Sequence, residues 1–195
     1  MKKVGYEKNV MDREFFDRPA DKVARELLGC YLVHETAEEV LRGRIVETEA
    51  YFGEEDPGSH AYNGRTERTK LMFDSYGKAY VYLCYGMYDL LNVTTSSDSV
   101  GAVLIRAVEP VSGVETMKKN REKDDIMLLT DGPGKLTQAF DIDRSLNGKI
   151  MVSGELRIEE GESPERIGKS GRIGISEGGE LMLRFFDKVS DHISF

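Results

Sequence analysis

Histidine and cysteine, which supply most transition-metal ligands and redox sites, are scarce in this chain of 195 residues. Its three histidines are His34, His60 and His192, and none of them has the HxxxH spacing of a helical zinc site. Its two cysteines, Cys30 and Cys84, lie far apart and form no CxxC motif. We therefore expect no metal and no cofactor, and we interpret both cysteines as small buried apolar residues.

Long apolar segments are also absent. No stretch reaches the roughly 18–20 consecutive apolar residues that a membrane span requires. The N-terminal sequence MKKVGYEK lacks the apolar centre of a secretion signal. These two absences predict an intracellular protein that has no membrane partner.

Positive charge is in short supply. Lysine and arginine number 27 against 35 aspartate and glutamate residues, which gives a net charge of -8 and a pI near 5.1. Taken alone, this balance argues against a polyanionic partner, because phosphate binding requires local positive charge. A binding face responds to the local field, however, and basic residues are concentrated in segments 65–78 and 118–123, while acidic residues crowd segment 155–165. The acidic excess is therefore compatible with a basic face elsewhere on the molecule.

Length and composition predict one domain, because 195 residues with 39% apolar residues can form a single core. Periodicity and turn residues predict strands at 30–34, 41–51, 78–84, 91–95, 102–108, 172–175 and 181–186. Helices are predicted at 19–28, at 112–121 behind a capping-box pair, and after the turn at 131–134 as far as residue 140. Because strands and helices do not alternate regularly, we predict an α+β fold: a single compact domain, residues 1–195, with a curved, mainly antiparallel sheet and flanking helices.

The segment RIVETEAY at residues 44–51 carries two carboxylates on a predicted strand. Side chains alternate along a strand, so Glu47, Glu49 and Tyr51 are expected to share one face. A carboxylate beside an aromatic ring on a half-buried strand indicates a general base in a pocket. A solvated polar face opposite the core is the alternative interpretation of the same pattern.

Tyrosine is concentrated in the segment YVYLCYGMY at residues 80–88. Its side chain has a flat apolar body and a polar tip, a shape suited to stacking on nucleobases. Tyr80 and Tyr82 are expected to share one strand face, and the step from Tyr85 to Gly86 is expected to break the strand and present Tyr85 at a turn. A hydrogen-bonded tyrosine core is the alternative.

Arg106 lies in the otherwise apolar segment VLIRA at residues 103–107. A buried unpaired charge is costly, so this arginine either has a carboxylate partner such as Glu49 or lies on an exposed edge strand. The DGPGK turn at 131–135 lacks the Walker A spacing and is interpreted as an ordinary turn, although amides at a helix start can hold a phosphate.

Several stretches of the chain match one known family in their order. They are RGRIVETEAY, HAYNGRT, AYVYLCYGMYDLLNV, VLIRAVEP and GPGKLTQA, followed by the weaker RIGI and LRFF. Together they resemble the alkyladenine (3-methyladenine) DNA glycosylase family from about residue 24 to residue 186. Each stretch alone is weak, but their joint presence in this order is highly specific. The resemblance implies a compact α+β domain with a curved antiparallel sheet, in agreement with the fold expected above.

The resemblance assigns the chemistry to two side chains. Glu49 resembles the family's general base, which activates a water, and Arg106 resembles its partner in holding that water. Asn92 resembles the residue that clashes with the 2-amino group of normal guanine. Tyr51, His60 and Tyr82 resemble the walls that contact a base flipped out of the duplex.

The resemblance also assigns a region that enters DNA. Tyr85 resembles the family's wedge residue, which inserts into the duplex at the position that the flipped base has left. Met87 and Tyr88 are expected to help shape this wedge region. The basic residues expected to contact the DNA backbone are Arg65, Arg68 and Lys135.

These assignments imply a DNA-repair glycosylase that flips damaged purines, such as 3-methyladenine and hypoxanthine, out of double-stranded DNA and hydrolyses their bond to the sugar. The motifs contain no lysine that is an obvious Schiff-base nucleophile, so we expect a monofunctional enzyme that leaves an abasic site. The family and the small size favour a monomer. It would work where the DNA is, in the cytoplasm and nucleoid of a prokaryote or the nucleus of a eukaryote.

Two other classes of function stay open from the residues alone. The first is a non-catalytic nucleic-acid-binding module, in which the tyrosines stack on bases and Glu49 and Arg106 form a structural ion pair. The second is a carbohydrate hydrolase that uses Glu47 and Glu49. The hydrolase fits poorly, because two carboxylates on one strand face are awkwardly placed to flank a sugar from opposite sides.

Overall fold

Two long strands, β2 (Val40–Tyr51) and β5 (Gly101–Ser112), pair antiparallel along their length and organise the fold. The computed structural model describes residues 9–96 and 98–194. The other strands in these residues are β1 (Tyr31–Glu35), β3 (Ala79–Cys84), β4 (Tyr88–Thr95), β6 (Leu156–Glu159), β7 (Ile167–Ser170) and β8 (Arg184–Asp187). They form one sheet in the order β3-β4-β5-β2-β1-β6, with β8 paired to both β2 and β7, and every ladder is antiparallel.

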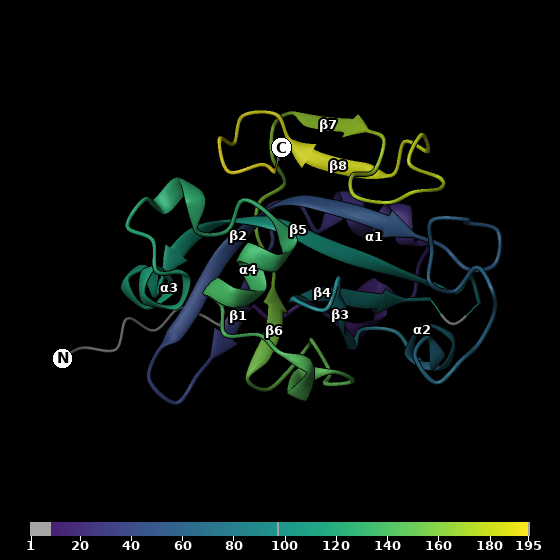
Figure 1. The fold of residues 1–195 in the computed structure, drawn as a ribbon, viewed down its shortest axis with the longest axis horizontal. Helices are drawn as coiled ribbons and strands as arrows, with labels where there is room; N and C mark the ends of the chain where they lie inside the picture. The colour runs from purple at the N-terminus through teal and green to yellow at the C-terminus, as the bar shows by residue number, and fades with distance from the viewer. Residues whose placement is uncertain (1–8, 97, 195) are drawn as a thin grey trace.

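β2 is the strand at which the sheet divides. Along one edge, its first half pairs with β1, from Val40 to Arg44, and its second half pairs with β8, from Glu47 to Glu49. Two strands therefore diverge from a shared neighbour, and the sheet curls instead of staying flat. Figure 1 shows that the β7–β8 pair and the β3–β4 pair consequently lie on opposite sides of the long β2–β5 ribbon.

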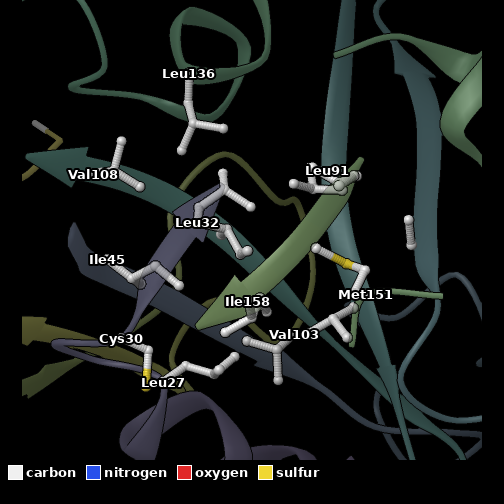
Figure 2. Close-up of a cluster of buried hydrophobic side chains, with 14 of the residues drawn as sticks. Leu27, Cys30, Leu32, Ile45, Leu91, Val103, Val108, Leu136, Met151 and Ile158 are labelled. Carbon is white, nitrogen blue, oxygen red and sulfur yellow. The ribbon is translucent and has the colours of Figure 1, made fainter. Parts of the chain in front are cut away.

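Alternation along the strands places the main hydrophobic core on one face of the sheet. Ile45 on β2, Leu91 on β4 and Val103 on β5 are completely buried in one cluster. Leu27, which follows helix α1 (Ala20–Glu26), and Leu136 of helix α4 (Pro133–Ala139) lie at opposite ends of this cluster (Figure 2). The core therefore ties both helices to the sheet.

The described residues contain four α-helices, which flank the sheet. α1 contacts β2, β5 and β8, whereas α4 contacts β4 and β5 and packs against α3 (Val114–Arg121). The short α2 (Lys70–Asp74) contacts β4 and β5. Three 3-10 turns complete the elements: η1 (Arg13–Phe16), η2 (Ile126–Leu128) and η3 (Arg144–Leu146). The predicted α+β class, with a curved antiparallel sheet and flanking helices in one compact domain, is confirmed for the described residues.

Three local predictions are wrong. Residues 172–175, expected as a strand, form an irregular loop, because Arg172 turns inward to a buried carboxylate. The strand expected from residue 181 begins only at Arg184. The capping box at Ser112 does not form: its hydroxyl donates to the Val40 carbonyl at 3.2 Å, and Gly113, with a φ of 75°, precedes α3 instead.

Other expectations have mixed outcomes. Cys30 is buried as expected, but Cys84 is only half-buried, because it ends β3 beside an exposed turn. The segment MKKVGYEK lies outside the described residues, so the assignment of residues 1–195 to one glycosylase domain stays a prediction. None of the helices in the described part of the chain has both the length and the hydropathy to cross a membrane.

Leu91→Ala tests the position of the core. We expect it to lower the free energy of unfolding by about 2–5 kcal/mol, because the leucine is completely buried and its removal leaves a cavity. Val189, which is 64% exposed, provides the matched control, and Val189→Ala should change the same quantity by less than about 0.5 kcal/mol. Urea denaturation measures both, and equal losses would contradict the assigned core.

Candidate active site

A row of side chains crosses four strands on the sheet face opposite the main core. Tyr80 on β3 faces Asn92 on β4, and Asn92 faces Leu104 on β5. Leu104 in turn faces Glu49 on β2. Directly opposed residues of antiparallel strands point to the same face, so the register brings residues that are far apart in the sequence into one line.

A buried ion pair clamps the irregular segment 171–180 beside this row. Arg172 and Asp56 are inaccessible to solvent and form two hydrogen bonds of 2.6 Å. Arg172 also donates to the Ala50 carbonyl at 3.0 Å and lies over the Tyr51 ring, 4.6 Å from its centroid. Burial alone would raise the pKa of Asp56, but the hydrogen bonds and charge of Arg172 outweigh it and hold that pKa below its ordinary value. The pair fixes the segment that reaches Glu49.

Glu49 is completely buried, and three donors surround its carboxylate. Oε2 accepts from the Tyr51 hydroxyl at 2.7 Å, Oε1 accepts from the amide of Ile173 at 2.8 Å, and Arg106 Nη1 lies 3.2 Å from Oε1. These contacts offset the cost of placing a charge away from water. Burial, followed by the charge of Glu49, raises the pKa of Tyr51 above its ordinary value, so that hydroxyl stays a proton donor.

Arg106 reaches Glu49 through an irregularity in the β2–β5 ladder. The pairing passes from Ala107 to Ile105 between two adjacent residues of β2, which leaves Arg106 without a directly opposed partner. A β-bulge of this kind re-aims a side chain. The Arg106 side chain is 7% exposed and also donates from Nε to Glu47 at 2.8 Å. The edge-strand alternative is wrong, since β5 lies between β4 and β2.

Glu47 faces no open space. It is completely buried, and its Oε1 lies 2.8 Å from Arg106 Nε and 2.6 Å from Arg184 Nε. A glycoside hydrolase requires two carboxylates that both reach the sugar. The enclosure of Glu47 argues against the carbohydrate-hydrolase interpretation.

Tyr51 links Glu49 to a cavity of about 50 Å³. Four aromatic residues form its walls: Tyr51, His60, Tyr80 and Tyr82. The other lining residues are Gly58, Ser59, Met72, Asn92, Ala102 and Ile175. The fold therefore brings together all four residues expected at the flipped base, whereas Glu49 lies behind the Tyr51 hydroxyl and is not among the described residues that line the space.

The cavity walls hold one another in place. The rings of His60 and Tyr82 pack edge to face with centroids 4.5 Å apart, and Tyr80 lies 5.4 Å from Tyr82. Asn92 Nδ2 donates to the carbonyl of Tyr80 at 3.1 Å, which fixes the amide at the cavity surface. The space has a rigid aromatic lining with one oriented polar group, as is typical of a site for a flat ring.

The hydrogen bonds of His60 define its tautomer. Arg68 has only donors, so its 3.3 Å contact with Nε2 makes that nitrogen an acceptor. Nδ1 then carries the proton and donates to the Tyr80 hydroxyl at 3.0 Å. Burial, and then the charge of Arg68, lowers the pKa of His60 to about 4. His60 is therefore neutral at physiological pH.

The turn between β3 and β4, together with the first residue of β4, projects three large side chains into solvent. Tyr85, Met87 and Tyr88 are 81%, 70% and 47% exposed. Tyr85 has a φ of 51° and Gly86 a φ of 70°, and the amide of Met87 donates to the Cys84 carbonyl at 3.1 Å. A positive φ is unusual for tyrosine, and such strain at an exposed tip is typical of a functional position.

A groove of about 780 Å³ lies between the turn and the cavity. Tyr85 lines the groove, and His60, Tyr82 and Ile175 line both the groove and the cavity. An exposed aromatic tip, a groove and an aromatic cavity therefore form one continuous surface.

The three basic residues expected at the DNA backbone are placed differently. Arg68 lines the groove. Arg65 forms an exposed ion pair with Asp74 at 2.6 Å. Lys135 pairs with Asp131 at 2.7 Å and lines a separate hollow of about 350 Å³. The structure brings Arg68 to the groove and to the outer side of His60, 3.3 Å from its Nε2, whereas carboxylates partner the other two.

Several contributors to the site were not predicted. Ile173 acts through its backbone amide, which leaves no residue-type signal. Arg172 and Asp56 lie far apart in the sequence, and the only available signal was that Arg172 opens the weakly matched RIGI stretch. Tyr80 was expected on the same strand face as Tyr82, but not as a wall of the base site.

A buried carboxylate held by an arginine, and joined through a tyrosine to an aromatic cavity, is an arrangement suited to binding a flat ring and to acid–base chemistry. The sequence profile of the methylpurine-DNA glycosylase (MPG) family matches residues 14–191. The chain belongs to the methylpurine-DNA glycosylase family. It is accordingly a monofunctional DNA glycosylase of DNA repair, as the resemblance implied.

Relatives match nearly the whole chain. One from Methanocella arvoryzae is 47% identical over 191 residues, which cover 95% of this chain and 96% of the relative. Another, from Alkaliphilus oremlandii, is 45% identical over 198 residues, covering 94% and 98%. A third, from Methanoculleus marisnigri, is 44% identical over 186 residues, covering 92% and 96%. Each carries the name "Putative 3-methyladenine DNA glycosylase".

The titration of His60 tests the electrostatics of the cavity. In NMR of ¹⁵N-histidine-labelled protein, we expect His60 to titrate near pH 4 instead of near its ordinary pKa of 6.5. Because the folded pKa lies below the unfolded one, unfolding takes up protons in acid. The contribution of His60 to stability is therefore complete above about pH 6.5 and is lost as the pH falls towards about 4.

Arg68→Met separates the causes of this shift. Removing the Arg68 charge should raise the pKa of His60 part of the way back, because burial remains. Arg65→Met is the matched control and should leave the pKa of His60 unchanged. A wild-type titration near pH 6.5 would contradict the environment described for His60.

Proposed function

We propose that this protein excises damaged purines from double-stranded DNA. It flips the nucleotide, holds the base among Tyr51, His60 and Tyr82, and uses Glu49 to activate the water that hydrolyses the sugar–base bond. The observation that supports the proposal most directly is the buried contact of Glu49 with Arg106, joined through Tyr51 to an aromatic cavity. The proposed lesions are 3-methyladenine, which occurs in the names of the relatives, and hypoxanthine.

Flipping is the first step of the proposal. A base stacked in the duplex is out of reach, and extruding it costs a few kcal/mol, least for a damaged or mismatched base. Tyr85 fills the vacated space and slows the return of the base, as other intercalating side chains do. The groove that runs from Tyr85 to His60 and Tyr82 offers the path into the cavity.

Recognition follows inside the cavity. Stacking on an aromatic wall contributes about 1–3 kcal/mol per base, and a cationic alkylated purine gains more through cation–π attraction. His60 is neutral at physiological pH, so its ring adds no charge that would repel such a cation. Asn92, held by the Tyr80 carbonyl, is the proposed barrier to the 2-amino group of guanine.

Hydrolysis proceeds through an oxocarbenium-like state at the sugar. The water oxygen bonds to the anomeric carbon, the carbon–nitrogen bond breaks with its electron pair going to the purine, and Glu49 takes the proton of the water. Arg106 Nη1, which lies near Glu49 and 3.5 Å from the Ile173 carbonyl, is the proposed second contact of that water. No lysine lines the cavity or the groove among the described residues, which favours release of the base without strand cleavage.

We extend the proposal to a monomer that acts on lesion-bearing duplex inside the cell. A single chain supplies the exposed tip, the cavity and the Glu49–Arg106 contact. No second copy is required to complete the site.

Glu49→Gln tests the assigned base. We expect single-turnover release of hypoxanthine from a duplex oligonucleotide to fall by roughly 10²–10⁴-fold, because an amide cannot take the proton of the water. Affinity for the lesion duplex should stay near that of the wild type. The exposed Glu38, between β1 and β2, gives the control: Glu38→Gln should release the base at the wild-type rate.

Two results would contradict this assignment. Near-normal release by Glu49→Gln would show that another group activates the water. A wild-type protein that binds lesion duplex tightly but releases no base from it would instead favour the non-catalytic stacking module.

Tyr85→Ala tests the wedge. We expect the Kd for lesion duplex to rise about tenfold or more, because a stacked aromatic side chain contributes about 1–3 kcal/mol. Tyr85→Phe keeps the ring and should bind nearly as the wild type does. Fluorescence of 2-aminopurine beside the lesion reports flipping, and unchanged affinity and flipping in the alanine variant would rule out the role.

A further inference from the structure

We propose that Arg184 and Ser194 are positioning residues that act through Glu47, aiming Arg106 at Glu49 and keeping Glu49 ionised. This inference rests on the proposed role of Glu49 as the base. It concerns residues near the end of the chain that make no contact with the aromatic cavity.

Glu47 is the centre of this arrangement. It lies two residues before Glu49 on the same strand face and is completely buried. Its Oε1 accepts from Arg106 Nε at 2.8 Å, from Arg184 Nε at 2.6 Å and from Ser194 Oγ at 2.7 Å. Its Oε2 accepts from the amide of Ser194 at 2.5 Å. A carboxylate so enclosed influences the reaction only through its partners.

Every nitrogen of the Arg106 guanidinium has a partner, and Ser194 Oγ accepts from two of them, since Nε also lies 3.3 Å from it. Nε donates to Glu47, and Nη2 donates to Ser194 Oγ at 3.0 Å. Nη1 is the remaining nitrogen and lies 3.2 Å from Glu49 Oε1. Because the guanidinium is planar and rigid, fixing two nitrogens aims the third. Ser194 therefore sets the orientation of the group that faces Glu49.

Arg184 supplies the second positive charge. It lies directly opposite Glu49 in the β2–β8 ladder, yet its Nε goes to Glu47 and its Nη2 to the Ser194 carbonyl at 3.0 Å. Two buried carboxylates are thereby matched by two guanidiniums. Without Arg184, Arg106 would be the only guanidinium of the described residues in contact with either carboxylate, and like charges that share one counter-ion favour protonation of one of them.

Three other ionisable groups act electrostatically on Glu49: Tyr51 on β2, Tyr82 on β3 and Arg172 in the 171–180 segment. Burial raises the pKa of Tyr51 and that of Tyr82, so both are neutral in the pH range of an assay. Arg172 is held by Asp56. Changes at Arg184 and Glu47 therefore alter the charge near Glu49 without altering these groups.

The pH–rate profile of hypoxanthine release tests the charge balance. Arg184→Met should move the acid limb to higher pH by roughly one pH unit or more, because one guanidinium then serves two carboxylates. Glu47→Gln should move it to lower pH, because two guanidiniums then serve Glu49 alone. Arg184→Lys retains the charge and should restore most of the wild-type profile. If the two substitutions only loosened the site, the release rate would fall, but the acid limbs of Arg184→Met and Glu47→Gln would not move in opposite directions.

Ser194→Ala removes a hydrogen-bonding group but no charge. We expect the release rate to fall about tenfold with the acid limb and the Kd for lesion duplex unchanged. Arg44→Met is the matched control for Arg184→Met, because it breaks another ion pair between β2 and β8, with Asp187 at 2.9 Å, and does not touch Glu47. Shifts of the same sign in Arg184→Met and Glu47→Gln, or an Arg44→Met shift as large as that of Arg184→Met, would overturn the proposal.

A direct measurement separates this inference from the proposed function. NMR of ¹³Cδ-glutamate-labelled protein without DNA follows the carboxylate of Glu49, identified by the signal lost in Glu49→Gln. If the Glu49 titration moves in opposite directions in Arg184→Met and Glu47→Gln, the inference is supported, even if Glu49→Gln still releases base. If the titration is the same in both variants as in the wild type, the inference is overturned. If Arg184→Met does not fold, the comparison of Glu47→Gln with the wild type decides, with a displacement to lower pH as the supporting result.

Discussion

A carboxylate removed from water is the constraint on which the rest of the structure depends. Burying an unpaired charge costs more free energy than the net stability of a small domain, so a carboxylate as buried as that of Glu49 requires donors that replace its hydration. The donors come from different parts of the chain: Tyr51 from the same strand, Arg106 from β5, and the amide of Ile173 from the 171–180 segment. That segment is itself held by the buried pair of Arg172 with Asp56. Strand pairing, loop and ion pair all have to be in place before one acidic group is satisfied.

The sheet meets this constraint by separating stability from chemistry. On β5, Val103 and Ile105 pack into the main core, while Leu104 and Arg106 face the site. A substitution on one face of the strand can therefore leave the packing on its other face intact. Regular alternation alone would not suffice, because the bulge at Arg106 is what directs its guanidinium between Glu47 and Glu49. Regular alternation thus fails at the proposed active site, and functional sites are where such failures are expected.

The contrast between regular strand alternation and contacts made by distant segments explains which parts of the site could be inferred from the sequence. Alternation in ETEAY correctly indicated that Glu49 and Tyr51 lie on the same strand face, and the cost of a buried charge correctly required a partner for Arg106. The bulge, the clamp made by Asp56 and Arg172, and the role of Ser194 could not be inferred, because each depends on segments that meet only after folding. Ile173 contributes a backbone amide, which any residue could supply. The strand expected at 172–175 failed for a related reason: its apolar pattern fits a strand, but the inward turn of Arg172 to Asp56 outweighs that local preference.

An acidic protein and a DNA substrate are reconciled by the way the basic residues are held. Arg65 pairs with Asp74 where both side chains are about half exposed, at 54% and 49%, and exposed pairs of this kind add little to stability. On the prediction that Arg65 contacts the DNA backbone, exchanging the carboxylate of Asp74 for a phosphate would therefore cost little. In the free protein, the pairing reduces the field that would attract undamaged DNA. On the proposed function, discrimination then depends on the Tyr85 tip and the aromatic cavity and not on net charge. Affinity gained in this way depends less steeply on salt than affinity gained by neutralising phosphates with unpaired lysine and arginine.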